Sequence, residues 1–402
     1  MMIRRSPAPT AKKAVSVGLK VPACFGFALL AGWAWGAGPA GCADPVIVDQ
    51  NFDFGSKPTG DGGTTTTVKY TASPSNKGAL SSEATGADYQ QWKRDPAYVV
   101  DGSDLYMFYA GSSYTAEQWS LAFYKTQTAG TWPSTAQLAF RGRTGKWDAM
   151  DLTAPSVRIG SGAKYTMWYA GNGDPTRPDY VSQIGMATSN DGVSWTRSDT
   201  PALAAPTFNG TSATSTPSAS RPDAYGAGDP WVMQDGTSLV MYYAGLDCSS
   251  GTCIYQILRS VSSDNGATFP PGSVVLSGRQ GIPEEAGGVA GPSVVQLNGQ
   301  YILTYTGVGT AATKSRLGVR KALSSGSVGI ATSKDGINFS YAGVNPSGLI
   351  LRAAGTFYPE GAGAPSLYVS GTSLKLYFTG LVDSVATGTF FSILPADLAE
   401  VK

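Results

Sequence analysis

Residues 94–111 read RDPAYVVDGSDLYMFYAG, and this stretch decides the predicted fold. It combines a proline, a first strand, a polar Asp-Gly turn and a second strand that ends in Ala-Gly. The second strand carries large apolar side chains at successive positions, Met107, Phe108 and Tyr109. Such a strand is expected in a sheet that is covered on both faces. The proline is expected at the start of the first strand, where a missing N–H costs least.

The same pattern recurs four more times. It appears as TAPSV (153–157) with YTMWYAG (165–171), GDPWV (228–232) with LVMYYAG (239–245), AGPSV (290–294) with YILTYTG (301–307), and GAPSL (363–367) with LKLYFTG (374–380). A strand–turn–strand unit repeated at this period is typical of propellers and solenoids. Blades stacked around an axis would cover both faces of each sheet. We therefore predict an all-β, five-bladed β-propeller that forms one domain over residues 44–402, with blades beginning near residues 94, 153, 228, 290 and 363.

Three units continue into a turn of shared form: SNDGVSW (189–195), SSDNGATF (262–269) and SKDGINF (333–339). Their Asp-Gly and Asn-Gly pairs supply the positive φ angles of a tight hairpin. These turns resemble the Asp-box of sialidases, where the role is structural, so we assign them no chemistry. The fifth unit ends near residues 390–394, and a strand near residues 68–70 is expected to pair with it and close the ring.

The first 43 residues are predicted to be an export signal. A basic start is followed by an apolar stretch from Val21 to Trp35 and a segment rich in small residues. Cleavage after Ala43 is one interpretation, and lipidation of Cys42 at a lipoprotein-like site is another. A third is a cytoplasmic protein with an apolar N-terminal helix. We expect an exported protein: extracellular, periplasmic, or an outer-surface lipoprotein whose lipid is its one link to a membrane.

The composition excludes several classes of function. Charged residues make up 14% of the chain, the formal net charge is +1, and no basic stripe follows the N-terminus, which argues against a nucleic-acid partner. Histidine is absent, so Ser-His-Asp and Cys-His catalysis and His-ligated zinc are excluded. Cys248 and Cys253 are expected to form a small disulfide loop in an oxidising compartment. No cofactor is required by this pattern, and a structural calcium ion is an open alternative.

Carboxylates are expected to converge at one mouth of the axial channel. Asp95 and Asp229 stand directly before the blade proline, where the other units have Ala154, Gly291 and Ala364. A second set lies in the segments that approach the proline. Three of its members stand seven residues before the proline, and two stand nearer: Asp148, Asp223 and Glu285, with Asp151 and Glu360.

This arrangement resembles the five-bladed furanosidase superfamily known from glycoside hydrolase families 43 and 32, over roughly residues 88–395. The resemblance implies that Asp95 is the general base and that Asp229 orients the sugar and tunes the acid. Family 43 has a Glu-Gly-Pro in the fourth blade for the general acid, whereas this chain has Ala290 before Gly291 and Pro292. We therefore predict that Glu285 supplies the acid from a displaced position, with Glu284 and Glu360 as weaker candidates.

Other side chains near these acids are candidate substrate-binding residues. Arg94 is expected to neutralise Asp95 and hold it ionised. The predicted substrate-binding set is Arg94, Trp92, Asp148, Trp231 and Glu360; Trp147 also flanks these acids. Each has a plain structural alternative, because Asp before Pro often starts a turn, aromatic residues at blade edges often pack, and the second set of acids can cap turns or bind calcium.

The leading hypothesis is a glycoside hydrolase, expected to be a monomer, whose substrate is a carbohydrate containing furanoside or pentose units. If the reaction retains configuration, Asp95 is the nucleophile rather than the base, and the separation of the carboxylates decides between the two. A second hypothesis is a glycan-binding propeller without catalysis, which Ala290 favours. A sialidase-like enzyme is a third, which requires an arginine triad and is disfavoured by five rather than six repeats.

Overall fold

The computed structural model describes residues 68–75, 77–82, 86–113, 118–160, 163–173, 182–205, 221–250, 252–309, 326–344, 347–352, 361–384 and 388–401. The chain divides between Asp44 and Pro45, and all the elements below belong to the second unit. The predicted export signal, Cys42 and Glu360 lie outside the described residues.

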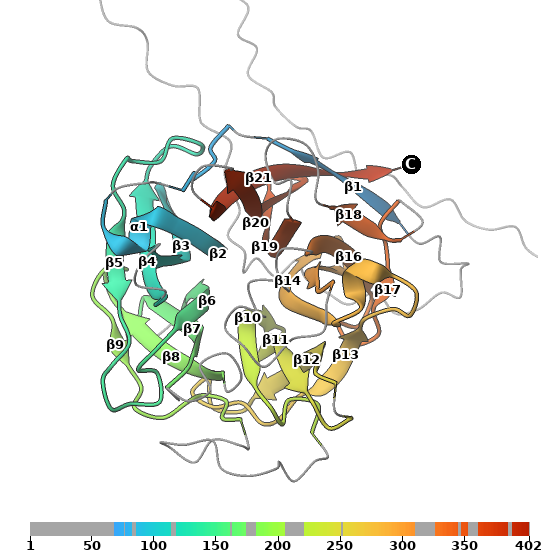
Figure 1. Ribbon diagram of the computed structural model, residues 1–402, viewed down its shortest axis with the longest axis horizontal. Coiled ribbons are helices and arrows are strands. Elements are labelled where there is room, and N and C mark those ends of the chain that lie inside the picture. Colours follow the sequence, from blue (N-terminus) through green and yellow to red (C-terminus); the bar gives the residue numbers. More distant parts are fainter. Residues whose placement is uncertain are drawn as a thin grey trace, which may run out of the picture. The chain divides into compact units, whose positions relative to one another are not determined.

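Five antiparallel sheets are arranged around an axis as the blades of a propeller (Figure 1). Blade one contains β2 (Trp92–Asp101), β3 (Asp104–Ser112), β4 (Ser120–Thr126) and β5 (Gln137–Phe140), and blade two contains β6 (Leu152–Ile159), β7 (Tyr165–Gly171), β8 (Gln183–Ser189) and β9 (Thr196–Arg197). Blade three contains β10 (Ala227–Asp235), β11 (Ser238–Asp247), β12 (Ile254–Ser262) and β13 (Ser273–Ser277). Blade four contains β14 (Val289–Leu297), β15 (Gln300–Gly307), β16 (Ser327–Ser333) and β17 (Ser340–Tyr341), with β18 (Leu349–Leu351) also paired to β16.

Blade five confirms the predicted closure of the ring. It joins β19 (Gly361–Ser370), β20 (Ser373–Ser384) and β21 (Gly388–Val401) to β1 (Lys69–Pro74) from the other end of the described chain. The β1 strand pairs with β21 along its whole length, from Lys69 opposite Val401 to Pro74 opposite Ala396. Tyr70 is buried in the apolar core of this blade, so backbone pairing and side-chain packing both hold the closing strand.

The hydrophobic core lies between the blades, as strands that are apolar on both faces require. One cluster joins Phe108 of blade one to Met167 and Tyr169 of blade two, and all three side chains are completely buried. A second cluster joins Trp168 of blade two to Met241 of blade three. Two short helices, α1 (Asp88–Gln91) and the 3-10 helix η1 (Pro283–Glu285), precede β2 and β14. Neither helix in the described part of the chain has the length and hydropathy to cross a bilayer.

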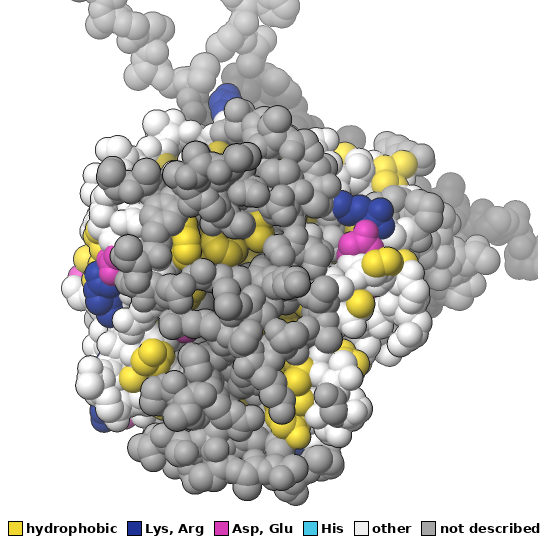
Figure 2. Space-filling view, in the orientation of Figure 1, with side chains coloured by type: hydrophobic (Ala, Val, Ile, Leu, Met, Phe, Trp, Pro, Cys, Tyr) yellow, Lys and Arg dark blue, Asp and Glu magenta, His cyan; other side chains and the backbone are white. Residues whose placement is uncertain are grey.

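The three predicted turns and the disulfide are confirmed. In the first turn Asp191 accepts hydrogen bonds from the N–H groups of Val193 and Ser194, and Gly192 has a φ of 75°. Asp264 and Asp335 make the matching contacts in blades three and four. Cys248 and Cys253 form a disulfide in the loop between β11 and β12. In the view of Figure 2, two groups of charged side chains, each with both signs, lie at the left and at the upper right.

Removal of β1 is expected to destabilise the ring, because β21 would lose its partner strand and Tyr70 would leave the core of blade five. A chain that starts at residue 76 should melt at a temperature at least about 3 °C below that of a chain that starts at residue 68, since in a domain of this size about two net kcal/mol shift the melting temperature by this amount. The measurement is thermal unfolding by circular dichroism. Equal melting temperatures would show that β1 does not contribute to closure.

Candidate functional site

Each of the five inner strands contains a β-bulge at its proline. The ladder between first and second strands is interrupted at Arg94/Ala97, Thr153/Ser156, Gly228/Trp231, Ala290/Ser293 and Gly363/Ser366. The residue before each proline has a positive φ: Asp95 (55°), Ala154 (48°), Asp229 (47°), Gly291 (53°) and Ala364 (46°). The proline therefore lies inside the strand rather than at its start, which corrects the prediction. The bulge turns the preceding residue out of the ladder at the mouth of the channel.

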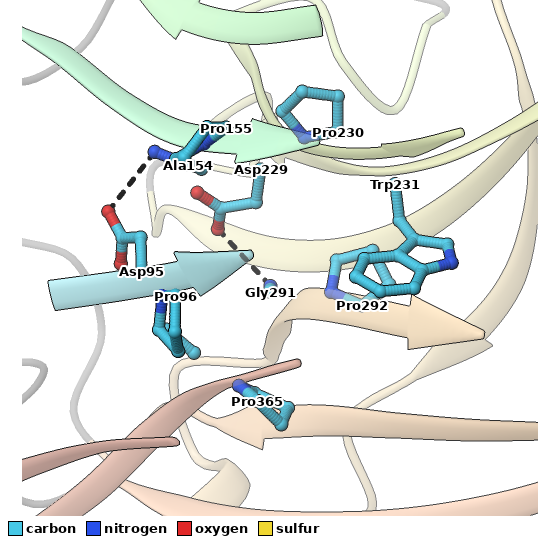
Figure 3. A pocket seen from close by; sticks show the side chains of 11 residues that line it. Asp95, Pro96, Ala154, Pro155, Asp229, Pro230, Trp231, Gly291, Pro292 and Pro365 are labelled. Carbon is cyan, nitrogen blue, oxygen red and sulfur yellow. Dashed lines mark hydrogen bonds between the residues drawn. The ribbon is translucent and has the colours of Figure 1, made fainter. Parts of the chain in front are cut away.

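One pocket at this mouth collects the bulges of all five blades (Figure 3). Its lining consists of the five residues before the prolines, the prolines themselves and Trp231. Asp95 and Asp229 are the only ionisable side chains among these residues. The enclosed part of the pocket is small: about 30 Å³ is open to the centre of a water molecule, which is room for a few waters. A sugar ring would therefore bind above this small enclosed volume rather than inside it.

Asp95 is held by groups from three blades. Its Oδ2 accepts a hydrogen bond from Arg94 Nε at 2.8 Å and another from the N–H of Ala154 in blade two at 3.2 Å. The N–H of Asp95 donates to Thr379 Oγ1 of blade five at 3.0 Å. The Arg94 guanidinium also lies 4.9 Å from the centre of the Trp119 ring, a distance typical of a cation–π contact. The expected ion pair between Arg94 and Asp95 is therefore present.

Asp229 has a different environment. Its Oδ2 accepts a hydrogen bond from the N–H of Gly291 in blade four at 3.1 Å. Burial, and then the nearby Asp95 carboxylate, raise the pKa of Asp229 to about 6, against the opposing effects of Arg94 and the Gly291 N–H. Arg94 bonds directly to Asp95 and acts on Asp229 only at longer range, so it opposes the rise in the pKa of Asp229 without cancelling it.

The two aspartates also connect neighbouring blades, and hydroxyl groups do the same elsewhere in the ring. Ser156 Oγ accepts from the N–H of Val232, joining blade two to blade three. Ser293 Oγ accepts from Leu367 N–H, joining blades four and five, and Ser366 Oγ accepts from Tyr98 N–H, joining blades five and one. These serines directly follow the prolines of blades two, four and five. Blades one and three have Ala97 and Trp231 there, and these are the two blades with an aspartate before the proline.

Two threonines add further connections. Thr306 Oγ1 accepts from Ala364 N–H at 2.7 Å, and Thr379 Oγ1 accepts from Asp95 N–H. Sequence reasoning missed these serines and threonines. The sequence does distinguish them: the three blades without Asp before the proline have Ser after it, and Thr-Gly replaces Ala-Gly in the last two units. We call the whole set of side chains that accept from the next inner strand the blade staples: Asp95, Ser156, Asp229, Ser293, Thr306, Ser366 and Thr379.

The acids seven residues before the proline belong to a repeated buried ion pair, not to the pocket. Glu285 bonds to Arg279 Nε at 3.0 Å and accepts from Tyr305 OH at 2.8 Å, and its side chain is fully buried. Glu285 is paired with Arg279 and is absent from the pocket lining, so the structure does not bring it beside Asp95 and Asp229, and its role as the acid stays a prediction. Asp148 is bonded in the same way by Arg143, Arg197 and Tyr169.

Asp223 completes this pattern with Arg221 and Tyr243. The Asp148 side chain likewise has no exposure and does not line the pocket, so its substrate-binding role stays a prediction. An arginine side chain is ion-paired with each of the three acids. Among the described residues no group of three or more Asp, Glu or Cys side chains is placed to hold a metal ion.

Of the three predicted tryptophans, two pack against other aromatic rings and one lines the pocket at the mouth. Trp92 is 6% exposed and packs against Trp119 and Phe391, with ring centres 6.3 and 5.9 Å away, so it offers no open face to a sugar. Trp147 stacks on Tyr169. Trp231 lines the pocket and donates from Nε1 to the Val294 carbonyl of blade four at 2.6 Å.

Two acids of the approach segments also have partners of their own. Glu284 pairs with Arg352 at 3.1 Å. Asp151 accepts from the N–H of Trp119 and interacts electrostatically with Arg94, which places it near the mouth but outside the pocket lining.

Comparison with solved structures identifies the fold. The protein BT0996, in a complex with RGII, matches with a TM-score of 0.57 at 15% identity, covering 82% of this chain and 92% of that one. A thermostable family-43 glycoside hydrolase matches at 0.53 and 18%, covering 77% and 89%. The catalytic domain of the GH62 α-L-arabinofuranosidase of Coprinopsis cinerea matches at 0.52 and 12%, covering 82% and 97%.

The protein thus has the five-bladed propeller fold of these glycoside hydrolases, as the sequence resemblance implied. No protein-family model matches the sequence, and no curated protein matches it. At identities of 12–18% the likeness extends to the fold, and the chemistry has to be argued from the site itself.

Loss of a hydroxyl staple is expected to weaken the contact between blades. Ser156→Ala should lower the free energy of unfolding by about 1–2 kcal/mol, because the buried N–H of Val232 would lose its acceptor. Denaturant unfolding measures the change. Ser103→Ala, in the exposed turn of blade one, is the matched control and should stay within about 0.5 kcal/mol of the wild type. An equal, small effect of both substitutions would contradict the staple role.

Asp229→Asn is expected to change the pH dependence of stability. With a native pKa of about 6, Asp229 stays protonated in the folded state while it ionises in the unfolded chain from about pH 4 upward. The wild type therefore loses stability as pH rises from about 4 to 6, and the loss is complete above the native pKa. The uncharged amide keeps an acceptor for Gly291 and does not titrate.

Relative to the wild type, Asp229→Asn should therefore gain on the order of 1–2 kcal/mol between pH 4 and pH 7. Denaturant unfolding at both pH values measures the difference. A constant difference between the two proteins across this range would show that the pKa of Asp229 is not raised.

Proposed function

We propose that this protein is an exported glycoside hydrolase that acts on glycans containing furanoside or pentose units. The observation that carries the proposal is the convergence of Asp95 and Asp229 on one pocket at the mouth of the propeller (Figure 3). Solved structures with this fold include proteins named as arabinofuranosidases and a β-xylosidase, which supports pentose-containing substrates. The RGII complex of BT0996 supports carbohydrate as the kind of ligand.

Asp95 is suited to act as the carboxylate of the reaction. Arg94 is ion-paired to Oδ2, and this leaves Oδ1 without a hydrogen bond to any described residue. In an inverting reaction Asp95 would take a proton from the water that attacks the anomeric carbon, and in a retaining reaction it would attack that carbon itself. Thr379 and Ala154 fix the backbone and the carboxylate from two sides, so the group is positioned before substrate arrives.

Export is proposed from the N-terminal sequence, where a basic start precedes an apolar stretch and small residues. The disulfide between Cys248 and Cys253 supports an oxidising compartment. Lipidation of Cys42 is kept in this proposal as the alternative to cleavage after Ala43.

A second candidate function is glycan binding without catalysis, and two observations favour it. Ala290 stands where family 43 has its general acid, and Glu285 is held by Arg279 away from the pocket. In addition, Asp95 and Asp229 act as blade staples, and serines do the same work in other blades. Such a protein would bind a glycan at the mouth and release it unchanged.

Hydrolysis of a glycan panel separates the two functions. The panel contains arabinan, arabinoxylan and the 4-nitrophenyl and phenyl glycosides of α-L-arabinofuranose and β-D-xylose. The wild type should release sugar from at least one of them, and Asp95→Asn should lower kcat/KM about 10²–10⁴-fold, because the amide cannot accept a proton or attack carbon. The amide oxygen can still accept the hydrogen bonds from Ala154 and Arg94.

The control is Asp104→Asn, which neutralises a partly buried aspartate that is paired with Lys125 in the same blade and lies outside the pocket lining, and it should leave kcat/KM unchanged. A wild type that retains one of these polysaccharides on an affinity gel but cleaves none of the panel would overturn the enzyme proposal in favour of the binding protein.

A further inference from the structure

The reaction proposed above lacks a group to protonate the leaving oxygen. The family position is Ala290, whose methyl group carries no acidic proton. Glu285 is neutralised by Arg279 and is fully buried outside the pocket. Among the described residues, the pocket lining holds two carboxyl groups and no other ionisable side chain. One of the two, Asp95, is ion-paired with Arg94.

Resting on the proposed hydrolase function, we propose that Asp229 itself is the general acid, so that the site works with two carboxyl groups. Asp229 projects from the bulge of blade three into the same pocket as Asp95 (Figure 3). Its Oδ2 is occupied by the N–H of Gly291, whereas Oδ1 makes no hydrogen bond to any described residue. The proton is therefore carried on Oδ1, the oxygen that is free to reach a substrate.

Burial, and then the Asp95 carboxylate, raise the pKa of Asp229 and keep it protonated in mildly acidic solution, whereas Arg94 and the Gly291 N–H oppose this. The groups that act on it are the Asp95 carboxylate and the Arg94 guanidinium of β2 and the N–H of Gly291 of β14. Arg94 is divided among Asp95, Asp229 and Asp151 and bonds directly only to the first. The net result is a pKa of about 6 for Asp229. When the environments of two neighbouring carboxyl groups give them different pKa values, the group with the higher pKa usually acts as the acid and the other as the base.

The step balances with these two residues and water. The Oδ1–H of Asp229 transfers its proton to the glycosidic oxygen as the bond from that oxygen to the anomeric carbon breaks. A water molecule attacks the anomeric carbon and loses a proton to Asp95. After both products leave, the proton on Asp95 and the negative charge on Asp229 are exchanged through solvent, which restores the starting state. In the retaining alternative Asp95 attacks the anomeric carbon as Asp229 gives its proton to the leaving oxygen. Water, which loses a proton to Asp229, then attacks that carbon and breaks its bond to Asp95, so that both carboxyl groups return to their starting states.

The substitution Asp229→Asn tests the role through the leaving group. The amide keeps an acceptor for Gly291 but carries no acidic proton. With the phenyl glycoside, a poor leaving group, kcat/KM should fall about 10²–10⁴-fold, whereas with the 2,4-dinitrophenyl glycoside, which needs no protonation, the fall should be less than about 10-fold. Asp95→Asn should slow both substrates by a similar factor, because its role does not depend on the leaving group.

The wild type alone provides a second test that does not require the variant to fold. Its kcat/KM for the phenyl glycoside should decline as pH rises through about 6, because Asp229 loses its proton there. The 2,4-dinitrophenyl glycoside should show a much weaker decline on this side of the profile. In Asp229→Asn the difference between the two profiles should disappear.

The outcomes separate the acid role from the proposed hydrolase. A wild type that cleaves neither the aryl glycosides nor the polysaccharides overturns the hydrolase and, with it, the acid. A wild type that cleaves them, combined with equal losses for both leaving groups in Asp229→Asn, overturns the acid role alone and leaves Asp229 as a residue that orients the sugar. Equal pH profiles of the two aryl glycosides in the wild type also overturn the acid role.

Discussion

The inner strand of every blade must place one residue in a left-handed conformation directly before a proline. This constraint is unfavourable for any residue other than glycine, and four of the five positions hold Asp or Ala. The bulge turns a backbone N–H out of the ladder, and the neighbouring blade supplies an oxygen for it at four of the five positions: Asp95 for Ala154, Asp229 for Gly291, Thr306 for Ala364, and Thr379 for Asp95. The same bulge turns the side chain into the mouth. The architecture of the ring thereby determines where chemistry is possible.

This double use explains why the two aspartates are hard to interpret from sequence. A carboxylate at the bulge satisfies the next blade through Oδ2 and still presents Oδ1 to the pocket. A serine after the proline makes a comparable contact but leaves nothing for a substrate. Stapling alone would therefore be served by a hydroxyl group, whereas aspartate at two blades also places a carboxyl group at the mouth. Arg94 is ion-paired with Asp95, and burial raises the pKa of Asp229.

The fold could be predicted from the sequence because each blade is a local unit. The repeat, the Asp-box turns and the disulfide all depend on residues close together in the chain, and the two aspartates share a position within the repeat. The burial of Trp92 could not be predicted, since it depends on Phe391 nearly three hundred residues away. The environment of Glu285, in contrast, has a signal in the sequence. Arginines precede Asp148, Asp223 and Glu285 by a few residues, and a tyrosine precedes each Ala-Gly or Thr-Gly that follows them. Together these residues form the buried ion pairs.

Blade five is the one blade built from both ends of the described chain, so no peptide bond locks the ring there. The seams on either side of it are also the two that carry a pair of staples, Ser293 with Thr306 and Ser366 with Thr379. Blades two and three also follow one another along the chain, and one staple, Ser156, joins their inner strands. The paired staples thus flank the one blade that strand pairing, rather than the chain itself, completes.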